Sequence, residues 1–363
     1  MPTIKEWLKD MMLIPALAGH EERMAAYFSK ELERFTDQVE TDRMGNVISH
    51  IKGTDPKAPV VMVFAHMDQL GFVIRKVESD GFLRIERLGG IPEKVLPGLR
   101  VLVESEEGKL YPGLIGPKAH HVTPAEEKYV VTPIGQLYVD IGLKSKDEAE
   151  ALGIFPGCPI VYYPFCEFFG KNKVSGTSID NRGGCAVLLD FARRMHAKRP
   201  QCTLYIVGSV LEEFNLRGAL VAAQVIQPDI AVALDVGGSG DTPDLKHHSG
   251  TRLSGGPTMS LYNFHGRGTL NGTLPHPAIV RSFLRSSKEN NIPLQRTAGI
   301  GGLTDLSYVQ LVGKGVAAID VGFPMRYSHS PVETCDLEDM DKLSELLDVT
   351  IRSWGPDMKE LRR

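Results

Sequence analysis

The sequence has no long hydrophobic run. No window approaches the roughly 20 consecutive apolar residues that a helix needs to span a bilayer, which excludes a protein with helical membrane spans. The segment Met1–Met24 alternates charged and apolar positions at helical spacing, and it lacks the basic start, apolar stretch and cleavage site of a signal peptide. We therefore expect a soluble protein with no secretion signal and no membrane partner.

Cysteine is scarce and shows no pairing pattern. The five cysteines form no CxxC motif, and their number is odd. Both features argue against a disulfide framework and against a cysteine-rich zinc site. A reducing compartment fits them best, so we expect the protein in the cytoplasm.

Long basic segments are also missing. The chain has 41 Lys and Arg against 45 Asp and Glu, which gives a formal net charge of −4. A nucleic-acid binder needs clustered positive charge to neutralise phosphates, so we expect no nucleic-acid partner. A peptide or another small substrate is the class that this charge balance favours.

Length and residue patterning predict two domains. At 363 residues, the chain exceeds what one hydrophobic core usually organises. Residues 5–35 predict one or two amphipathic helices, and residues 46–51 and 60–64 predict short strands. Between residues 71 and 165 the pattern changes to short alternating segments separated by Gly, Pro and charged turns, as in a small β-barrel. The strands predicted in this block cover residues 72–77, 83–87, 100–104, 137–141 and 159–163.

Helices and strands alternate again after residue 174. The predicted helices cover residues 183–196, 217–224, 277–290, 306–311 and 336–352, and the predicted strands cover residues 203–210, 230–235 and 315–321. The fold class expected from this order is α/β. Residues 1–70 and 166–363 are expected to form a mixed-sheet α/β sandwich as the catalytic domain, with a small β-barrel-like domain inserted at residues 71–165.

Chemically suggestive side chains lie where predicted strands end. His66 and Asp68 follow one strand, Glu212 and Glu213 follow another, and Asp235 ends a third. Sites in open α/β sheets form beyond the carboxyl ends of the strands, so these segments can converge. Imidazole and carboxylate groups are ligands for divalent metal ions, and two neighbouring ions need a bridging carboxylate.

Asp180 and His329 are further candidates for such a site. Asp180 precedes the predicted helix at residues 183–196 and is the candidate bridge, and His329 lies in a polar loop. Each candidate alone has a simpler interpretation: Asp180 is typical of a helix N-cap, and a lone histidine is typical of a solvated loop. Adjacent glutamates such as Glu212 and Glu213 are usually exposed acids. These residues become specific for a metal site only when their order along the chain and the residues beside them are considered together.

Five segments carry a resemblance to a known family. They read AHMDQLGF at residues 65–72, IDNRGG at 179–184, GSVLEE at 208–213, ALD at 233–235 and MRYSHSP at 325–331. In this order they resemble the glutamyl aminopeptidase and tetrahedral aminopeptidase family of dinuclear metallo-aminopeptidases, and the resemblance covers nearly the whole chain. It implies an enzyme that hydrolyses N-terminal residues from peptides. It also implies that the inserted β-rich domain serves oligomerisation, so we expect a homo-oligomer, with a dodecamer among the expected sizes.

The resemblance implies two divalent metal ions per subunit. Zinc is the expected metal, with cobalt and manganese as alternatives. His66 and Asp235 are implied to complete one metal site, Glu213 and His329 the other, and Asp180 to bridge the two ions.

The same resemblance implies catalytic roles for two further acids. Glu212 is implied as the general base, which accepts a proton from the metal-bridging water and returns it to the leaving amine. Asp68 is implied to accept the other N–H group of the His66 ring and so to fix its tautomer.

Some positions depart from the family pattern. Gln69 and Leu303 stand where the family usually carries Glu and Gly, and Leu211, Phe214 and Asn215 flank the double glutamate with unusual residues. None of these departures removes an expected metal ligand. They border the expected substrate pocket, so the preferred N-terminal residue is not carried over, and His120 and His121 in the insertion receive no role.

Two other functions are compatible with these residues. Related folds use almost the same ligands in other metal-dependent amide hydrolases, such as carboxypeptidases and N-acyl amino acid deacylases. They differ in which end of the substrate they hold, because an aminopeptidase must bind a free α-amine. A catalytically silent oligomeric scaffold is the second alternative, and the complete ligand set with its base argues against it.

Overall fold

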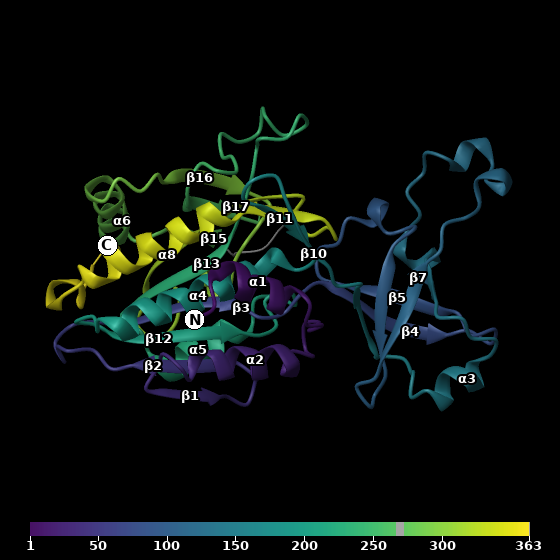
Figure 1. Cartoon of the computed structure of the whole chain (residues 1–363), viewed down its shortest axis with the longest axis horizontal. Helices are drawn as coiled ribbons and strands as arrows, with labels where there is room; N and C mark the ends of the chain where they lie inside the picture. Colours follow the sequence, from purple (N-terminus) through teal and green to yellow (C-terminus); the bar gives the residue numbers. More distant parts are fainter. Residues whose placement is uncertain (266–271, 363) are drawn as a thin grey trace.

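The computed structural model describes residues 1–265 and 272–362. Within these residues, a 12-stranded mixed sheet with helices on both faces lies beside a closed barrel of six strands (Figure 1). The expected α/β class with an inserted β-barrel-like unit is confirmed.

The helices and strands of the sandwich alternate along the chain. The helices outside the barrel block are α1 Ile4–Met12, α2 Glu22–Leu32, α4 Ile179–Ala197, α5 Gly218–Ile226, α6 Pro277–Glu289, α7 Leu306–Val309 and α8 Leu337–Arg352. The strands of the sheet are β1 Gln38–Thr41, β2 Val47–Ile51, β3 Val60–His66, β10 Cys166–Phe169, β11 Lys173–Gly176, β12 Thr203–Ser209, β13 Ile230–Gly238, β14 Thr258–Phe264, β15 Gly272–Thr273, β16 Gln295–Ile300, β17 Ala317–Arg326 and β18 Glu333–Asp336.

Parallel strands at the centre of the sheet set the position of the site. The strand order is β1-β2-β12-β3-β13-β17-β18-β11-β10, with β14 to β16 attached through β17. β3 pairs in parallel with β12 and β13, and β13 pairs in parallel with β17. The carboxyl ends of these four strands therefore meet at one edge of the sheet, where ligands bind in open α/β folds.

Helices cover both faces of the sheet. Along β3, Val61 and Val63 join the core beneath α1, α2, α4, α6 and α8, whereas Met62 and Phe64 join the core beneath α5 and α7. This period-2 alternation of apolar residues on both faces is what a buried parallel strand requires.

The barrel has a hydrophobic core of its own. Its strands are β4 Gly71–Val77, β5 Leu83–Leu88, β6 Arg100–Glu104, β7 Leu110–Ile115, β8 Tyr138–Asp140 and β9 Pro159–Tyr162, with α3 Lys146–Ala151 between the last two. Side chains such as Phe72, Ile85 and Ile160 fill its interior. Arg23 of α2 reaches Glu104 of β6 with two hydrogen bonds of 2.7 and 2.8 Å, which ties the barrel to the sandwich.

The sequence patterns locate most of these elements. All five strands predicted within residues 71–165 are present with small shifts at their ends. β7 was missed because Pro112 and Gly113 interrupt its apolar pattern. The short strands β10, β11 and β18, four residues each, were missed because so few residues show no period.

We propose that residues 71–165 form a separate oligomerisation domain. Residues 1–70 and 166–363 would then form one catalytic domain.

In the described part of the chain, no helix combines the length and apolar character that crossing a membrane demands.

Substitution of one glycine on β17 tests the pairing register of β13 and β17 at the centre of the sheet. Gly322 lies opposite Asp235 of β13, and a Cβ atom at Gly322 would overlap the backbone oxygen of Asp235. We expect Gly322→Ala to push the two strands apart and to lower the stability by about 1–3 kcal/mol, measured as a fall in melting temperature.

The matched control is Gly238→Ala at the end of β13, where an added Cβ would meet no atom of residues 1–265 or 272–362 within 4 Å. This control should melt close to the unsubstituted protein. Equal melting temperatures for the two variants would contradict the register of β13 and β17.

Candidate metal centre

The side chains singled out in the sequence come together at the carboxyl edge of the parallel strands. His66 is the last residue of β3, Asp180 lies in the first turn of α4, Glu212 and Glu213 follow β12, Asp235 lies within β13, and His329 lies between β17 and β18. Residues that are up to 263 positions apart, from His66 to His329, thus share one site because four strands end at the same edge.

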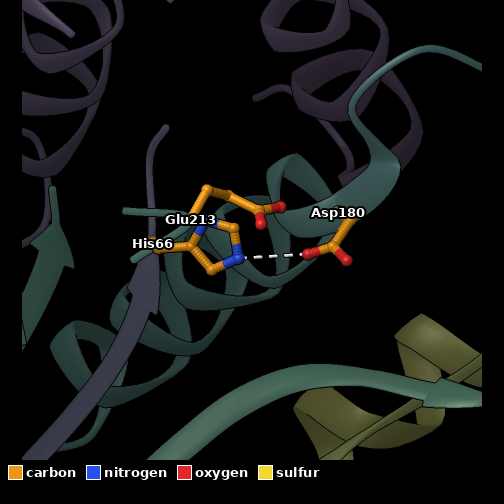
Figure 2. Close-up of side chains that lie close together, drawn as sticks. All are labelled: His66, Asp180 and Glu213. Carbon is orange, nitrogen blue, oxygen red and sulfur yellow. Dashed lines mark hydrogen bonds and ion pairs between the residues drawn. The ribbon is translucent and has the colours of Figure 1, made fainter. Parts of the chain in front are cut away.

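Three of these side chains form a tight group. Ligand atoms of His66, Asp180 and Glu213 all lie within 4.8 Å of one another (Figure 2). The His66 Nε2 atom lies 3.0 Å from Asp180 Oδ1, the contact drawn as a dashed line in Figure 2. The three side chains are no more than 6% exposed.

Asp180 faces a second histidine with its other oxygen. Asp180 Oδ2 lies 3.6 Å from His329 Nε2, and that nitrogen lies 3.9 Å from Glu213 Oε1. His66 Nε2 in turn lies 3.9 Å from Glu212 Oε2. The two oxygens of one carboxylate therefore point to two different imidazoles, and each imidazole has a different glutamate beside it.

Asp235 flanks this group from β13. Its Oδ1 atom accepts a 2.7 Å hydrogen bond from the backbone N–H of Val236. Asn181 donates to the carbonyl oxygen of Leu234 at 2.8 Å and so fastens the start of α4 to β13 beside Asp235. Burial, with the nearby charge of Asp180, raises the pKa of Asp235 well above its usual value.

Asp68 lies beneath the site and is fully buried. Its carboxylate accepts the backbone N–H groups of Glu212 at 3.1 Å and of Glu213 at 2.9 Å. The Nδ1 atom of His66 lies 3.3 Å from the backbone oxygen of Asp68 and 3.4 Å from its carboxylate. Asp68 therefore contacts both the histidine and the glutamate pair.

The ring of His329 is oriented by the barrel. Its Nδ1 atom lies 2.7 Å from the backbone oxygen of Gly90, just after β5, so this nitrogen carries the proton and donates it. In the neutral ring, Nε2 then presents its lone pair towards Asp180 and Glu213, as a ligand nitrogen requires.

Glu333 is a site residue that the sequence patterns missed. It is 2% exposed, and its two oxygens accept the backbone N–H groups of Asp180 at 3.0 Å and of His329 at 2.9 Å. The only signal was an acidic residue four positions after His329, which also suits an ordinary surface turn. Burial raises the pKa of Glu333 well above its usual value, and Asp180 adds to the rise.

The acidic groups carry more negative charge than the two imidazoles balance. Burial raises the pKa of Glu212 well above its usual value and the pKa of Glu213 to about 7. Burial would also raise the pKa of Asp180, but the hydrogen bond and charge of His66 lower it. The pKa of His66 and the pKa of His329 are both raised, because neighbouring carboxylates outweigh the effect of burial.

This donor set fits divalent metal ions. The Oε1 atom of Glu213 is buried and has no hydrogen-bond partner among the described residues. A buried acceptor without a partner is costly unless a cation or donor meets it. Two imidazoles among several carboxylates are the ligands that zinc and similar ions bind. Cations at this site would neutralise the carboxylates that otherwise repel one another.

The chain is similar to known aminopeptidases over most of its length. Residues 45–346 match the family model described as M42 glutamyl aminopeptidase. SgcX of Escherichia coli (strain K12), named provisionally as an aminopeptidase, is 35% identical, and the match covers 95% of this chain and 92% of that protein. The lysyl aminopeptidase of Pyrococcus furiosus is 29% identical, and the match covers 97% of each chain.

Solved structures show the same similarity. The aminopeptidase APDkam598 from the archaeon Desulfurococcus kamchatkensis superposes with a TM-score of 0.92 at 32% identity, over 98% of this chain and 96% of that chain. The TET1 peptidase of Pyrococcus horikoshii, described as assembling into a tetrahedron or a large octahedral shell, has a TM-score of 0.83 at 27% identity, over 97% of this chain and 100% of that chain.

The raised pKa values predict that metal ions stabilise the folded protein to an extent that depends on pH. An acid whose pKa is higher in the folded state stabilises the fold below its unfolded pKa, and this contribution is lost as the pH rises through the folded value. For Glu213 the loss spans its ordinary value of 4.5 to about 7. Metal ions need the ionised carboxylates and bind the folded state, so they stabilise the protein most where these groups are ionised.

We therefore expect the melting temperature to rise when zinc replaces a chelator, by little at pH 5 and by progressively more up to pH 8. Scanning fluorimetry in both buffers measures the gap. Glu213→Gln, which removes one of the titrating ligands, should narrow it. A gap that is absent or the same at every pH would contradict a carboxylate-rich metal centre.

Proposed function

The chain belongs to the M42 glutamyl aminopeptidase family, and we propose that it is a dinuclear enzyme that removes N-terminal residues from peptides with Glu212 as its general base. Family membership makes the chain an aminopeptidase, a metal-dependent hydrolase. The number of ions, their ligands and the base are the parts that we propose.

One observation carries the dinuclear proposal. The two oxygens of Asp180 point to His66 and to His329, at 3.0 and 3.6 Å. A carboxylate that bridges two ions must offer its two oxygens to two separate ligand groups in this way. We assign His66 and Asp235 to one ion and Glu213 and His329 to the other, with Asp180 shared.

The metal would supply Lewis acidity. When bound, divalent ions at such a site polarise the scissile carbonyl group and lower the pKa of the attacking water. Zinc is the metal that we propose, because imidazole and carboxylate ligands suit it, and cobalt or manganese would suit the same donors.

Proton transfer falls to Glu212. Its side chain is buried, but it is not part of the tight group that His66, Asp180 and Glu213 form. Burial raises its pKa well above the usual value, and its Oε2 atom lies 3.9 Å from Nε2 of His66, beside the proposed metal ligands. Glu212 takes a proton from the attacking water and passes it to the leaving amine.

Asp68 positions both the His66 ring and the two adjacent glutamates. Its contacts to Nδ1 of His66 hold the imidazole so that Nε2 faces Asp180. Its hydrogen bonds to the N–H groups of Glu212 and Glu213 hold the two glutamates beside the histidine. Asp68 therefore positions groups and does not itself contact the substrate.

The cysteines support a place for this enzyme in the cytoplasm. All five cysteines are free, and four of them are buried. Free cysteines without pairing are usual in a reducing compartment. We therefore propose the cytoplasm as the location.

We also propose that the chain forms a homo-oligomer, with a dodecamer among the expected sizes. The segment between β7 and β8 projects from the barrel, away from the sandwich, at the upper right of Figure 1. It exposes 69% of Val122, 95% of Tyr129 and 66% of Val130. Exposed apolar side chains on a projecting segment are typical of interfaces. The TET1 peptidase of Pyrococcus horikoshii, similar over nearly the whole chain, is described as assembling into a shell.

Sedimentation velocity at micromolar concentration tests this assembly. The protein should sediment as a species of several subunits, and Tyr129→Ser together with Val130→Ser should shift it to smaller species. Glu167→Ser, on the exposed strand β10 of the sandwich, is the control that should leave the size unchanged. A monomer at every concentration would contradict the proposal.

Substituting the adjacent glutamates one at a time separates a base from a ligand. Glu212→Gln keeps the shape of the side chain but removes its basicity, so the metal content should stay unchanged while kcat falls by roughly 10²–10⁴-fold. Glu213→Gln should weaken metal binding and should regain activity in excess zinc. Metal analysis and kcat on an aminoacyl chromogenic substrate measure both effects.

If Glu212→Gln lost its metal ions while Glu213→Gln kept them, Glu213 would be the base and Glu212 the metal ligand. An N-acetylated version of the substrate and an N-blocked peptide with a free C-terminal carboxylate, which a carboxypeptidase would cleave, distinguish the alternatives. An aminopeptidase requires the free amine, so neither compound should be hydrolysed. Hydrolysis of the blocked substrate at an equal rate would instead favour a deacylase.

A further inference from the structure

Four consecutive backbone N–H groups around the double glutamate are held by side chains from the N-terminal part of the chain. The hydrogen bonds run from Val210 to Asn46 Oδ1 at 3.1 Å, from Leu211 to Glu21 Oε1 at 3.0 Å, from Glu212 to Asp68 Oδ1 at 3.1 Å and from Glu213 to Asp68 Oδ2 at 2.9 Å. Two of the three acceptor residues, Glu21 and Asn46, have no place in the chemistry described above.

The loop at residues 210–218 needs such external support. Its carbonyl groups at Val210, Leu211 and Glu212 accept hydrogen bonds from the end of the same loop, at 3.0, 3.2 and 2.9 Å. Leu211 has a left-handed backbone with a φ of 57°, which costs a non-glycine residue about 1 kcal/mol or more. The carbonyl groups thus turn inward, and the N–H groups are left for acceptors outside the loop.

Asn46 joins the two ends of this loop. It is fully buried, its Oδ1 accepts the N–H of Val210, and its Nδ2 donates to the carbonyl oxygen of Gly218 at 3.0 Å. A Cβ atom at Gly218 would come within 2.5 Å of Asn46 Oδ1, so the close approach requires glycine there. Asn46 therefore fixes the point at which the loop leaves β12 and enters α5.

Glu21 holds the residue just before the glutamates. It is 6% exposed, at the start of α2, and its Oε1 accepts the N–H of Gly19 at 2.8 Å as well as that of Leu211. An oxygen in this place fixes the peptide plane between Val210 and Leu211. Together with Asp68, it determines the direction in which the next two side chains leave the backbone.

We propose that Glu21 and Asn46 are positioning residues for catalysis, which aim Glu212 and Glu213 at the two histidines. The inference rests on the roles proposed above for those glutamates. Aiming matters because Glu212 and Glu213 are adjacent in the chain, yet they must face different imidazoles, each at 3.9 Å. A displacement of about 1 Å in a catalytic group costs up to about 10²-fold in rate.

Three substitutions at Glu21 separate positioning from bulk stability. Glu21→Gln keeps an oxygen for Leu211 and should retain kcat within about threefold. Glu21→Asp keeps the carboxylate but shortens the side chain by one methylene, which moves its oxygen away from the N–H of Leu211. We therefore expect kcat to fall by about 10- to 100-fold with little change in KM. Glu21→Ala should resemble Glu21→Asp or fail to fold, and the test does not depend on it.

Metal affinity supplies a readout other than activity. Titration of the metal-free protein with zinc against a chelating dye should show at least one site weakened by about 10-fold in Glu21→Asp and in Asn46→Ala, because Glu213 is no longer held in place. Glu21→Gln should bind zinc as the unsubstituted protein does.

Asp339→Ala is the matched control. Asp339 is also a buried carboxylate that accepts two loop N–H groups, those of Ser254 and Gly256, each at 2.7 Å. Its removal should lower the melting temperature at least as much as Glu21→Asp does, yet leave kcat and zinc affinity within about twofold.

Two outcomes would overturn the inference. One is a Glu21→Asp variant that melts earlier but keeps kcat and zinc affinity, as in the control. The other is a Glu21→Gln variant as impaired as Glu21→Asp, because an oxygen at the position of Oε1 would then not be enough to hold the glutamates in place. Either result leaves the proposed function intact, whereas full activity of Glu212→Gln would remove the base itself.

Discussion

Mutual repulsion among buried carboxylates is the constraint on which this structure depends. Asp180, Glu212, Glu213 and Asp235 lie close to two imidazoles, and burial raises the pKa of three of these four acids. Such a cluster stays together only if the backbone beneath it is rigid and if protons or metal ions balance its charge. The parallel strands β3, β12, β13 and β17 supply the rigid backbone, since their carboxyl ends meet at one edge.

Two further buried acids hold the proposed metal-site residues in place by accepting hydrogen bonds from their backbone N–H groups. Glu333 binds the N–H groups of Asp180 and His329, and Asp68 binds those of Glu212 and Glu213. The carbonyl oxygen of Gly90, from the barrel, fixes the ring of His329. Segments from every part of the chain therefore meet at the site, and the barrel takes part in it directly.

Two of the candidate ligands can be predicted from the sequence because they follow the apolar pattern of buried strands. His66 follows an apolar run, and Asp235 ends another, so strand periodicity alone places both at the sheet edge. Glu333, Glu21 and Asn46 have no such signal, because their importance comes from hydrogen bonds to residues as many as 190 positions away. β7 was missed for a different reason, since its neighbours in the barrel impose a strand on a sequence that contains Pro112 and Gly113.

The most direct test of the account is the number of metal ions bound per chain. Elemental analysis of protein saturated with zinc and then freed of excess metal should give two ions per chain, and Asp180→Asn should lose tight binding of both, because Asp180 faces both histidines. A single ion in the unsubstituted protein, or two ions retained in Asp180→Asn, would contradict a centre built around one shared carboxylate.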